Sequence, residues 1–426
     1  MTAALGRFNS RTFASLRYHN YRLFFGGQAV SQTGSWMQRI ALGWFVYQLT
    51  HSPFAVGVMA FAQFVPFMVF GLFVGVLADR LDARRTVIAT QAAQLVTATV
   101  LAWLALGDIA HPWMLYLIAF VNGTVLVLDV PSRQQLTYRM VGREVLPNAI
   151  ALNSSLFNAS RIFGPAVAGI VYGFTGAGVC FLINAVSFLA VLLSLFAMRV
   201  RDFFPLERFA RPSILAGTRE GLAYVRTQRR MLVLLSLTLV LSTFSFNFNV
   251  TLPVLAAKTL HTDAQVYGVL SALFGGGALV GSLAAASLGR ASAKVMLLGG
   301  LVFTGSELLL APLSTPYAAG ILLFLVGVGF TAWSANSNAM MQLQAPDHLR
   351  GRIIGLYFYA FNGTGALAGL FAGWLCATGG TELAFAVGGA AGLLGTALAG
   401  IQLFGGRPPR LELRSSLRRA ALSARG

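Results

Sequence analysis

Five charged side chains stand inside long apolar stretches of this sequence: Arg39, Asp129, Arg133, Arg161 and Glu307. A charge in hydrocarbon is costly, so such side chains face a protein interior or a water-filled cavity. An arginine there can bind an anionic group, and a carboxyl group sealed from water can take up a proton. The residue types therefore indicate ligand binding and proton transfer inside a membrane, with Asp129 and Glu307 as the proton-coupling candidates.

Each charge also has a structural interpretation. Asp129 and Arg133 stand four residues apart, so they face each other on a helix unless Pro131 displaces one of them. Such pairing explains Asp129 at least as well as contact with a substrate does. No acidic residue is evident at the depth of Arg39 or Arg161. For these two arginines, facing a cavity and being satisfied in packing are equal alternatives.

Other kinds of chemistry lack their residues. No cluster of His, Cys and acidic residues has the spacing of a metal site, and no G-x-x-x-x-G-K-[ST] nucleotide-binding loop occurs. Cys180 and Cys376 lie in apolar runs and are expected to be small core residues. We therefore expect no metal, no cofactor, no ATP-driven pump and no enzyme.

The elements that must hold these residues are membrane helices. The chain has 426 residues, of which 56% are hydrophobic and 10% are charged, whereas a soluble protein has about 25% charged residues. The first apolar run continues past Leu42 without a small-residue cleavage site, which predicts a membrane helix rather than a signal peptide. The formal net charge of +18 resides in short segments between apolar runs. This distribution predicts a lipid bilayer, and not nucleic acid, as the partner.

Twelve apolar runs are long enough to cross a bilayer. They are 21–49, 54–78, 86–106, 113–137, 148–174, 178–198, 231–257, 265–288, 295–313, 317–340, 351–376 and 380–404. The sequence thus predicts an all-α polytopic membrane protein with twelve transmembrane helices in two six-helix halves. The expected parts are an N-terminal half (1–198), a cytoplasmic linker (199–230), a C-terminal half (231–404) and a basic cytoplasmic tail (405–426).

Basic residues occupy every second loop. Arg80, Arg84 and Arg85 lie in one such loop, and eight arginines lie in the segment Arg199–Arg230. The alternate loops contain a single basic residue, Lys258. Because basic loops stay on the cytoplasmic side, we expect a multi-pass protein of the inner (cytoplasmic) membrane with both termini in the cytoplasm.

The linker and the two halves carry weaker signals. Ile214, Leu215, Leu222 and Val225 could form one face of an interfacial helix, with an unstructured linker as the equal alternative. Met140–Gly169 and Gln344–Gly373 align without gaps with six identities, including Asn158 with Asn362. This register equates the fifth run with the eleventh, as a duplicated six-helix unit requires.

The segment Gly75–Arg85 reads G-V-L-A-D-R-L-D-A-R-R between two apolar runs. A solvated turn is one interpretation, and a gating loop is the other. The form G-x-L-A-D-R with further arginines resembles the signature loop between the second and third helices of the major facilitator superfamily. The resemblance implies the major facilitator fold and a gating loop with its partner on the fourth helix, made of Gly75, Asp79, Arg80, Arg84, Arg85 and Asp129.

The same resemblance implies specific contacts for this loop. Asp79 would dock at the start of the eleventh helix, near Arg350–Ile354, where the helix dipole favours an anion. A basic residue four positions after the aspartate commonly pairs with an acid on the fourth helix, but Ala83 occupies that position here. Arg80 or Arg84 would have to replace it. The arginine often found higher on the fourth helix of proton-coupled members has no counterpart between Tyr116 and Val121.

The fifth run contains Arg161-Ile-Phe-Gly164-Pro165-Ala-Val-Ala-Gly169. Glycines spaced in this way allow close helix packing, and Pro165 bends the helix. The element resembles the helix 5 motif of the exporting, antiport branch of the superfamily, with Ala168 in place of one glycine. Leu146–Asn153 and Gln38-Arg39 further resemble the bacterial branch that includes the enterobactin exporter and macrolide efflux proteins.

Polar side chains along the helices suggest a binding cavity. Arg39, Arg161, Gln32, Asn158 and Asn362 are our cavity and substrate candidates. At 1.5 Å per residue, Asp129 lies about 24 Å from the outer start of its helix, and Arg161 about 20 Å from the cytoplasmic start of its own. In this superfamily the ninth helix is peripheral, which places Glu307 toward lipid or packing rather than the cavity.

We expect a secondary active transporter that exports a small, amphiphilic, drug-like or siderophore-like molecule by alternating access, with proton antiport. Its partners would be the small-molecule substrate, the proton gradient and the lipid bilayer, and a monomer is one option for its oligomeric state. The alternatives are a facilitator importer or a lipid-handling transporter on the same fold, and, less well supported by the residues, a membrane-embedded enzyme or receptor.

Overall fold

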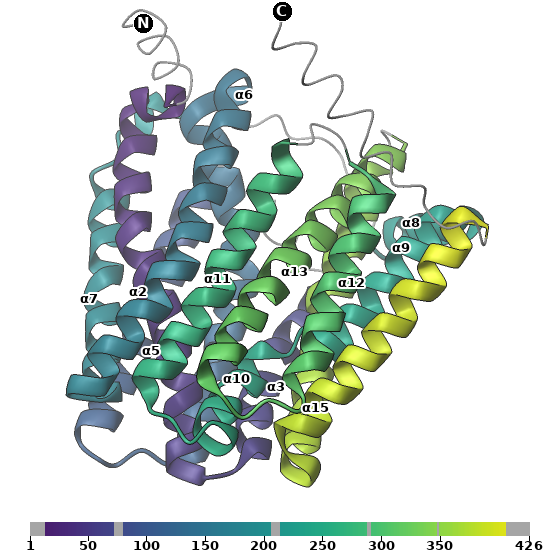
Figure 1. Ribbon diagram of the computed structural model, residues 1–426. Coiled ribbons are helices and arrows are strands. Elements are labelled where there is room, and N and C mark those ends of the chain that lie inside the picture. Colours follow the sequence, from purple (N-terminus) through teal and green to yellow (C-terminus); the bar gives the residue numbers. More distant parts are fainter. Residues whose placement is uncertain (1–12, 72–79, 206–213, 288–290, 347–348, 406–426) are drawn as a thin grey trace, which may run out of the picture.

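The computed structural model of the protein describes residues 13–71, 80–205, 214–287, 291–346 and 349–405 (Figure 1). Over these ranges the chain is almost entirely helical and contains no strand. The long helices stand side by side along a common direction, with α7 and α2 at one edge of Figure 1 and α12 and α15 at the other. The prediction of an all-α membrane protein is confirmed.

The helices before the linker begin with the short 3₁₀ segment η1. They are η1 (Ala14–Arg17), α2 (His19–Thr50), α3 (Pro53–Phe70), α5 (Ala83–Leu106), α6 (Pro112–Thr175) and α7 (Ala177–Phe196). After them come η2 (Val200–Asp202) and α8 (Ile214–Thr227).

The remaining elements include two π-helical segments, η3 and η4. In order they are α9 (Arg229–Val240), η3 (Leu241–Ser245), α10 (Phe248–Val254), η4 (Leu255–Thr259), α11 (Ala264–Ser287), α12 (Ala293–Leu310), α13 (Pro316–Gln344), α14 (Arg350–Asn362) and α15 (Gly365–Phe404).

Local sequence signals explain where several helices begin. Ser52 accepts a hydrogen bond from the N–H of Ala55 at the start of α3, and Asp82 accepts one from the N–H of Arg85 at the start of α5. Both are N-cap interactions that satisfy otherwise unpaired amides. Proline stands at the first turn of α3, α6 and α13, where its missing N–H costs nothing.

Two expected loops are sharp corners instead. The loop expected between residues 137 and 148 is helical except at Gly142, whose φ of 72° turns the chain within α6. The loop expected after residue 376 is the pair Gly379–Gly380, where φ reaches 71° within α15. Glycine adopts this positive φ without the steric penalty of a side chain, so each chain reversal needs few residues.

The corners bear on the number of spans. Among the residues that the structure describes, nine helical segments are long and apolar enough to cross a membrane. Two of these, Pro112–Thr175 and Arg350–Phe404, contain a corner and run through the bundle twice. The 32-residue α2 is also long enough to cross. The arrangement is compatible with the twelve expected helices.

The seventh and eleventh runs are interrupted, contrary to expectation. Within 231–257, α9 leads into η3, and the backbone leaves helical geometry at Phe246 before α10 begins. The N–H of Phe246 bonds to the carbonyl of Leu241, and the Asn247 amide bonds to the carbonyl of Thr243. These bonds replace the ordinary helical ladder, so the break is stabilised locally. The eleventh run breaks between α14 and α15 at Gly363 and Thr364.

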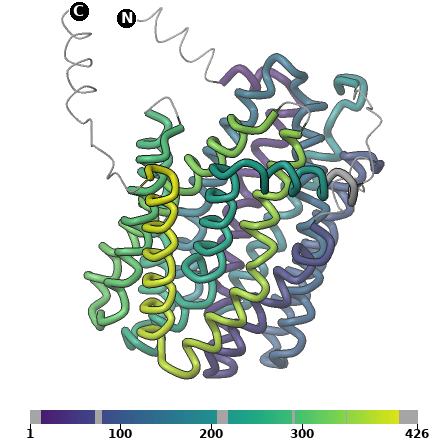
Figure 2. The backbone as a smooth tube through the Cα atoms, turned by 90° about the vertical axis from the view of Figure 1, so that its right-hand side faces the viewer, coloured from purple at the N-terminus to yellow at the C-terminus, as the bar shows by residue number. Residues whose placement is uncertain are grey.

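Of the two alternatives for the linker, a helix or an unstructured segment, the structure shows a helix over residues Ile214–Thr227, α8. Figure 2 shows this helix lying across the bundle rather than along it. Val225 is fully buried, and a Cβ at Gly221 would lie 3.3 Å from side-chain atoms of Arg352 and Leu356 on α14. Glu220 forms an ion pair with Arg352. The face of α8 that carries these residues therefore packs against protein.

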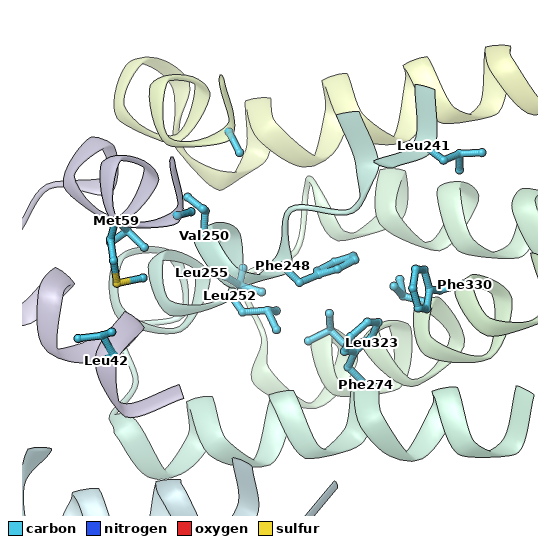
Figure 3. Close-up of a cluster of buried hydrophobic side chains, with 14 of the residues drawn as sticks. Leu42, Met59, Leu241, Phe248, Val250, Leu252, Leu255, Phe274, Leu323 and Phe330 are labelled. Carbon is cyan, nitrogen blue, oxygen red and sulfur yellow. The ribbon is translucent and has the colours of Figure 1, made fainter. Parts of the chain in front are cut away.

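The largest hydrophobic core cluster joins helices from both ends of the sequence. Leu42 of α2 and Met59 of α3 belong to the same cluster as Val250 and Leu252 of α10, and Figure 3 shows these side chains close together. Burying them stabilises the contact between elements more than 150 residues apart in sequence, and it positions the polar residues described next.

Candidate functional site

A close crossing of α3 and α15 joins the first group of helices (α2–α7) to the second (α9–α15). A Cβ at Gly57 would lie 2.7 Å from the carbonyl oxygen of Gly369 and 3.0 Å from the Cα of Gly373. Only glycine permits such an approach of two backbones. Gly57 lies one turn from Pro53, so this crossing is at the end of the bundle whose loops are poor in arginine. We call this end the arginine-poor end.

A second crossing, between α6 and α11, also lies toward the arginine-poor end. A Cβ at Gly268 would lie 2.6 Å from the Cα of Gly169 and 2.7 Å from the carbonyl oxygen of Pro165. Gly164 faces the other way, and a Cβ there would lie 2.4 Å from the Cβ of Trp36 on α2. The motif Gly164, Pro165 and Gly169 thus packs α6 against helices on both sides. Its role as an antiport element stays a prediction.

Asp129 is fully buried in a polar network between α2, α5 and α6. It is ion-paired with Arg133, and it accepts hydrogen bonds from the Thr90 hydroxyl at 2.6 Å and the Gln91 amide at 3.2 Å. Arg133 also donates to the side-chain oxygen of Gln28. Pro131 does not displace either partner of the pair. Its printed hydrogen bonds and ion pair involve none of the described residues 80–85, so the part of Asp129 in a gate stays a prediction.

The expected gating loop is described only in part. Gly75 and Asp79 lie outside the described residues. Arg80 and Arg85 are exposed. Arg84 donates from two guanidinium nitrogens to the carbonyl of Leu195, at 3.0 and 2.8 Å. This carbonyl belongs to the last turn of α7, where a cation is favourable. In this structure Arg84 therefore pairs with α7 and not with Asp129, the acid on the fourth helix.

The sequence interpretation missed Asp82, which has two roles in this region. Besides capping α5, its carboxylate accepts a hydrogen bond from Arg139 at 3.0 Å, and Arg139 lies over the ring of Phe203 at 4.9 Å. Partial burial alone would raise the pKa of Asp82, but the Arg85 N–H and the Arg139 guanidinium outweigh it and hold the pKa below its ordinary value. Its place directly before an apolar run was a usable sign of a cap.

The two arginine candidates are brought together around one aromatic ring. The guanidinium carbon of Arg39 lies 4.5 Å from the ring centre of Trp36, and that of Arg161 lies 5.9 Å from it. Arg161 also lies over Phe274 at 4.6 Å and Phe330 at 5.3 Å. Both arginines are half-buried. Cation–π attraction holds the charged groups in these positions.

The uncharged candidates are less closely grouped. Asn362 lines a cavity of about 50 Å³ together with Ser242, Asn247 and Asn249. Phe246 and Phe361 form apolar walls of the same cavity. The Asn158 amide bonds to the carbonyl of Ser154 on its own helix, and Gln32 is half-buried on α2. Neither of these two residues lines the cavity.

Glu307 is buried within the second group of helices, with 3% of its surface exposed. The Ser245 hydroxyl of η3 lies beside it, and a Cβ at Gly388 of α15 would lie 2.6 Å from its Oε1. Its Oε2 is buried without a hydrogen-bond partner among the described residues. The Glu307 side chain therefore packs against protein at the break in the seventh run. Of the two expected alternatives, lipid and packing, packing is the one that the structure shows.

Comparisons with known proteins agree with this architecture. Macrolide efflux protein A of Streptococcus pyogenes is 22% identical over 350 residues, which are 80% of this chain and 86% of that protein. The multidrug efflux pump Tap of Mycolicibacterium fortuitum is 24% identical over 360 residues, 83% of this chain and 88% of that protein. The staphyloferrin A transporter of Staphylococcus aureus is 28% identical over 176 residues, 41% of this chain and 44% of that protein.

Solved structures show the same fold. The nucleoside transporter NupG superposes with a TM-score of 0.72 at 12% identity, covering 90% of this chain and 99% of that chain. A POT family transporter superposes with a TM-score of 0.71 at 12% identity, covering 89% of this chain and 94% of that chain. The family model described as transmembrane secretion effector matches residues 10–411. The relatives of this chain are membrane transporters and not enzymes. The chain belongs to the transmembrane secretion effector family of the major facilitator superfamily.

Proposed function

We propose that this protein exports a small amphiphilic molecule across the cytoplasmic membrane by alternating access, in exchange for protons. Relatives named for macrolide, multidrug and staphyloferrin A transport support a drug-like or siderophore-like substrate. The observation that carries the proposal is the pair of glycine crossings, Gly57 with Gly373 and Gly169 with Gly268, at one end of the bundle. We call these two crossings the seam. The seam can open while the helices within each group, α2–α7 and α9–α15, stay packed against one another.

The moving bodies would be the six-helix halves 1–198 and 231–404, joined by the linker 199–230. The arginine-rich end, with both termini and the tail 405–426, would face the cytoplasm. The seam at the arginine-poor end would then close the outer side. The loop residues Gly75, Asp79, Arg80, Arg84 and Arg85 would form a gate on the cytoplasmic side, with Asp129 anchoring the fourth helix beneath it.

Glu307 is the better of the two proton-coupling candidates. Its Oε2 is buried without a hydrogen-bond partner in the part of the chain that the structure describes, whereas Asp129 already accepts hydrogen bonds from Arg133, Thr90 and Gln91. An ionised carboxylate enclosed without a cation is costly, so a proton suits Glu307. Because Ser245 beside it belongs to η3, losing that proton would disturb the break in the seventh run. That break leads directly to Phe246 and Asn247 of the cavity.

The cavity of about 50 Å³ is too small for a drug-sized molecule, since such ligands occupy about 300 Å³ or more. Substrate entry therefore requires the halves to move apart on the cytoplasmic side. The region between Arg39 and Arg161 on one side and Asn362 on the other is the proposed substrate path, with Gln32 and Asn158 along it.

The test is efflux from cells expressing the protein and preloaded with candidate compounds, with and without a protonophore. We expect accumulation to fall in energised cells and to return to the level of cells without the protein when the proton gradient collapses. Efflux that ignores the protonophore would remove proton antiport and leave a facilitator. Increased accumulation in expressing cells would overturn export itself. The oxidised Gly173→Cys/Gln265→Cys protein, which we expect to be inactive, controls for effects of membrane insertion.

A further inference from the structure

Arg39 and Arg161 come from different helices, α2 and α6, yet both guanidinium groups lie over Trp36. Because both guanidinium carbons lie within 5.9 Å of the same ring centre, their like charges repel each other. Two like charges in a half-buried site raise the free energy of the empty protein unless something of opposite charge joins them.

No such group is supplied by the part of the chain that the structure describes. Neither guanidinium has an ion pair or hydrogen bond among these residues. The two buried acids, Asp129 and Glu307, contact other groups. Each guanidinium has five N–H donors, and ring faces attract its plane without accepting those hydrogen bonds in full. The donors are therefore available to a ligand.

An aromatic wall extends from this pair of arginines. Phe330, beneath Arg161, stacks on Phe246 with ring centres 4.4 Å apart, and Phe246 lines the cavity next to Asn362. Phe274 contacts Arg161 from α11. A Cβ at Gly275 would lie 2.6 Å from the carbonyl oxygen of Arg161, so α11 is held against this part of α6. The charged site is thus continuous with an aromatic cluster in which Phe274 and Phe330 are 7% and 6% exposed.

We infer that Arg39, Arg161 and Trp36 bind the anionic head group of the substrate, with a carboxylate as the simplest case, while Phe274, Phe330 and Phe246 contact its apolar body. The inference rests on the proposed function, because it assigns the class of molecule that the transporter takes: anionic aromatic or aliphatic amphiphiles. Two arginines can hold a carboxylate with several charge-assisted hydrogen bonds. The same charges repel a cationic amphiphile.

The test is equilibrium binding to the purified full-length protein in nanodiscs, with empty nanodiscs subtracted. The three probes share one body: naphthaleneacetate (anion), naphthaleneacetamide (neutral) and naphthylmethyltrimethylammonium (cation). We expect naphthaleneacetate to bind at least tenfold more tightly than the amide and the cation to bind most weakly. Equal affinities, a preference for the cation, or no binding of any probe up to its solubility would each overturn the inference without needing a variant.

Variants then assign the preference to residues. In Arg39→Gln and Arg161→Gln the anion should lose at least tenfold in affinity while the amide changes less than twofold. Arg161→Lys keeps the charge and should retain part of the preference. Arg226→Gln, the same change at an exposed arginine of α8, is the matched control and should change nothing. A double Arg39→Gln/Arg161→Gln variant that still prefers the anion would contradict the assignment.

This experiment separates the inference from the proposed function. Binding needs neither a proton gradient nor a direction of transport, so anion-selective binding with no efflux in cells would retain the site and reject the exporter. Efflux with no anion preference in binding would retain the exporter and reject the site. A purely structural role of the arginine–tryptophan contacts predicts equal binding of the three probes in every variant.

Discussion

Asp82 carries two contacts that substitutions can separate. Asparagine can still cap α5 but cannot pair with Arg139, whereas alanine loses both contacts. We expect Asp82→Ala to cost about 1 kcal/mol through the cap, and Asp82→Asn to cost less, since a pair this exposed contributes under about 1 kcal/mol. Thermal unfolding in nanodiscs measures both. Equal losses in the two variants would contradict a capping role.

The lowered pKa of Asp82 also predicts a pH dependence. A group with a lower pKa in the folded protein stabilises the fold above its unfolded pKa, about 4, and loses this contribution as the pH falls through the lowered value. The stability difference between wild type and Asp82→Asn should therefore be present at about pH 6 and should vanish toward pH 3. A difference that grows on acidification would show that the sign is wrong.

Amide substitution of the two buried acids, Glu307 and Asp129, should change thermal stability to different extents. Glu307→Gln keeps the shape of a protonated carboxyl, so it should leave thermal stability nearly unchanged. Asp129→Asn leaves Arg133 without its partner and should cost up to about 3 kcal/mol, less than for a fully buried pair, because Arg133 is 22% exposed.

The same pair of variants bears on coupling. Efflux by Glu307→Gln should no longer respond to the protonophore, because the amide cannot release a proton. Asp129→Asn should slow turnover but keep its response to the protonophore. If Glu307→Gln is both stable and fully proton-driven, Glu307 is not the coupling residue.

At single residues, spacing predicted contacts within one helix better than contacts between helices. The four-residue interval of Asp129 and Arg133 was enough to suggest their pairing. Arg84 reaching Leu195 could not be foreseen, because it depends on how α5 and α7 pack. The shared Trp36 beneath Arg39 and Arg161 likewise depends on the crossing of α2 and α6.

Among helices, α11 offers a matched test of glycine packing. A Cβ at Gly268 would overlap the backbone of α6 at 2.6 Å, whereas at Gly276 its nearest neighbour is the ring of Phe324 at 3.9 Å. Gly268→Ala should destabilise the protein by about 1–3 kcal/mol through overpacking, and efflux should fall with it. Gly276→Ala, the control, should be neutral or slightly stabilising. Similar effects of both would mean that the α6–α11 crossing tolerates separation.

The bounds of uninterrupted helices followed closely from hydrophobic runs, as in α5 and α11. The break in the seventh run did not, because hydropathy stays high through it. Its π-helical turns depend on bonds from Phe246 and Asn247 that compete with the ordinary ladder. The corner at Gly142 was missed for a related reason: a single residue with positive φ reverses the chain without a polar loop.

For the whole molecule, the alternation of basic and neutral loops predicted twelve helices, with which the structure is compatible, because it depends only on the order of segments. The orientation that it predicts, with both termini in the cytoplasm, stays a prediction. Where along their length the two groups of helices touch was not predictable from the sequence. Glycines occur throughout membrane helices, and only the fold shows which of them face another backbone. Gly57 and Gly268 are of that kind, whereas a Cβ at Gly26 or Gly305 would meet no described atom of another helix within 4 Å.

Locking the seam tests alternating access directly. A Cβ at Gly173 of α6 would lie 2.6 Å from the Cγ of Gln265 on α11, and both residues are exposed. Cysteines at these two positions are therefore close enough for a disulfide between α6 and α11. Cys180 and Cys376, both buried, are replaced by alanine in the background protein.

Oxidation of the Gly173→Cys/Gln265→Cys protein should reduce efflux at least tenfold, and reduction should restore it, because the arginine-poor end must open once in every cycle. Thr259→Cys/Thr381→Cys is the matched control. The two native hydroxyl oxygens are 2.6 Å apart within the second group of helices, so this disulfide should form and leave efflux unchanged. Full efflux by the cross-linked Gly173→Cys/Gln265→Cys protein would mean that substrate leaves by a route that does not separate α6 from α11.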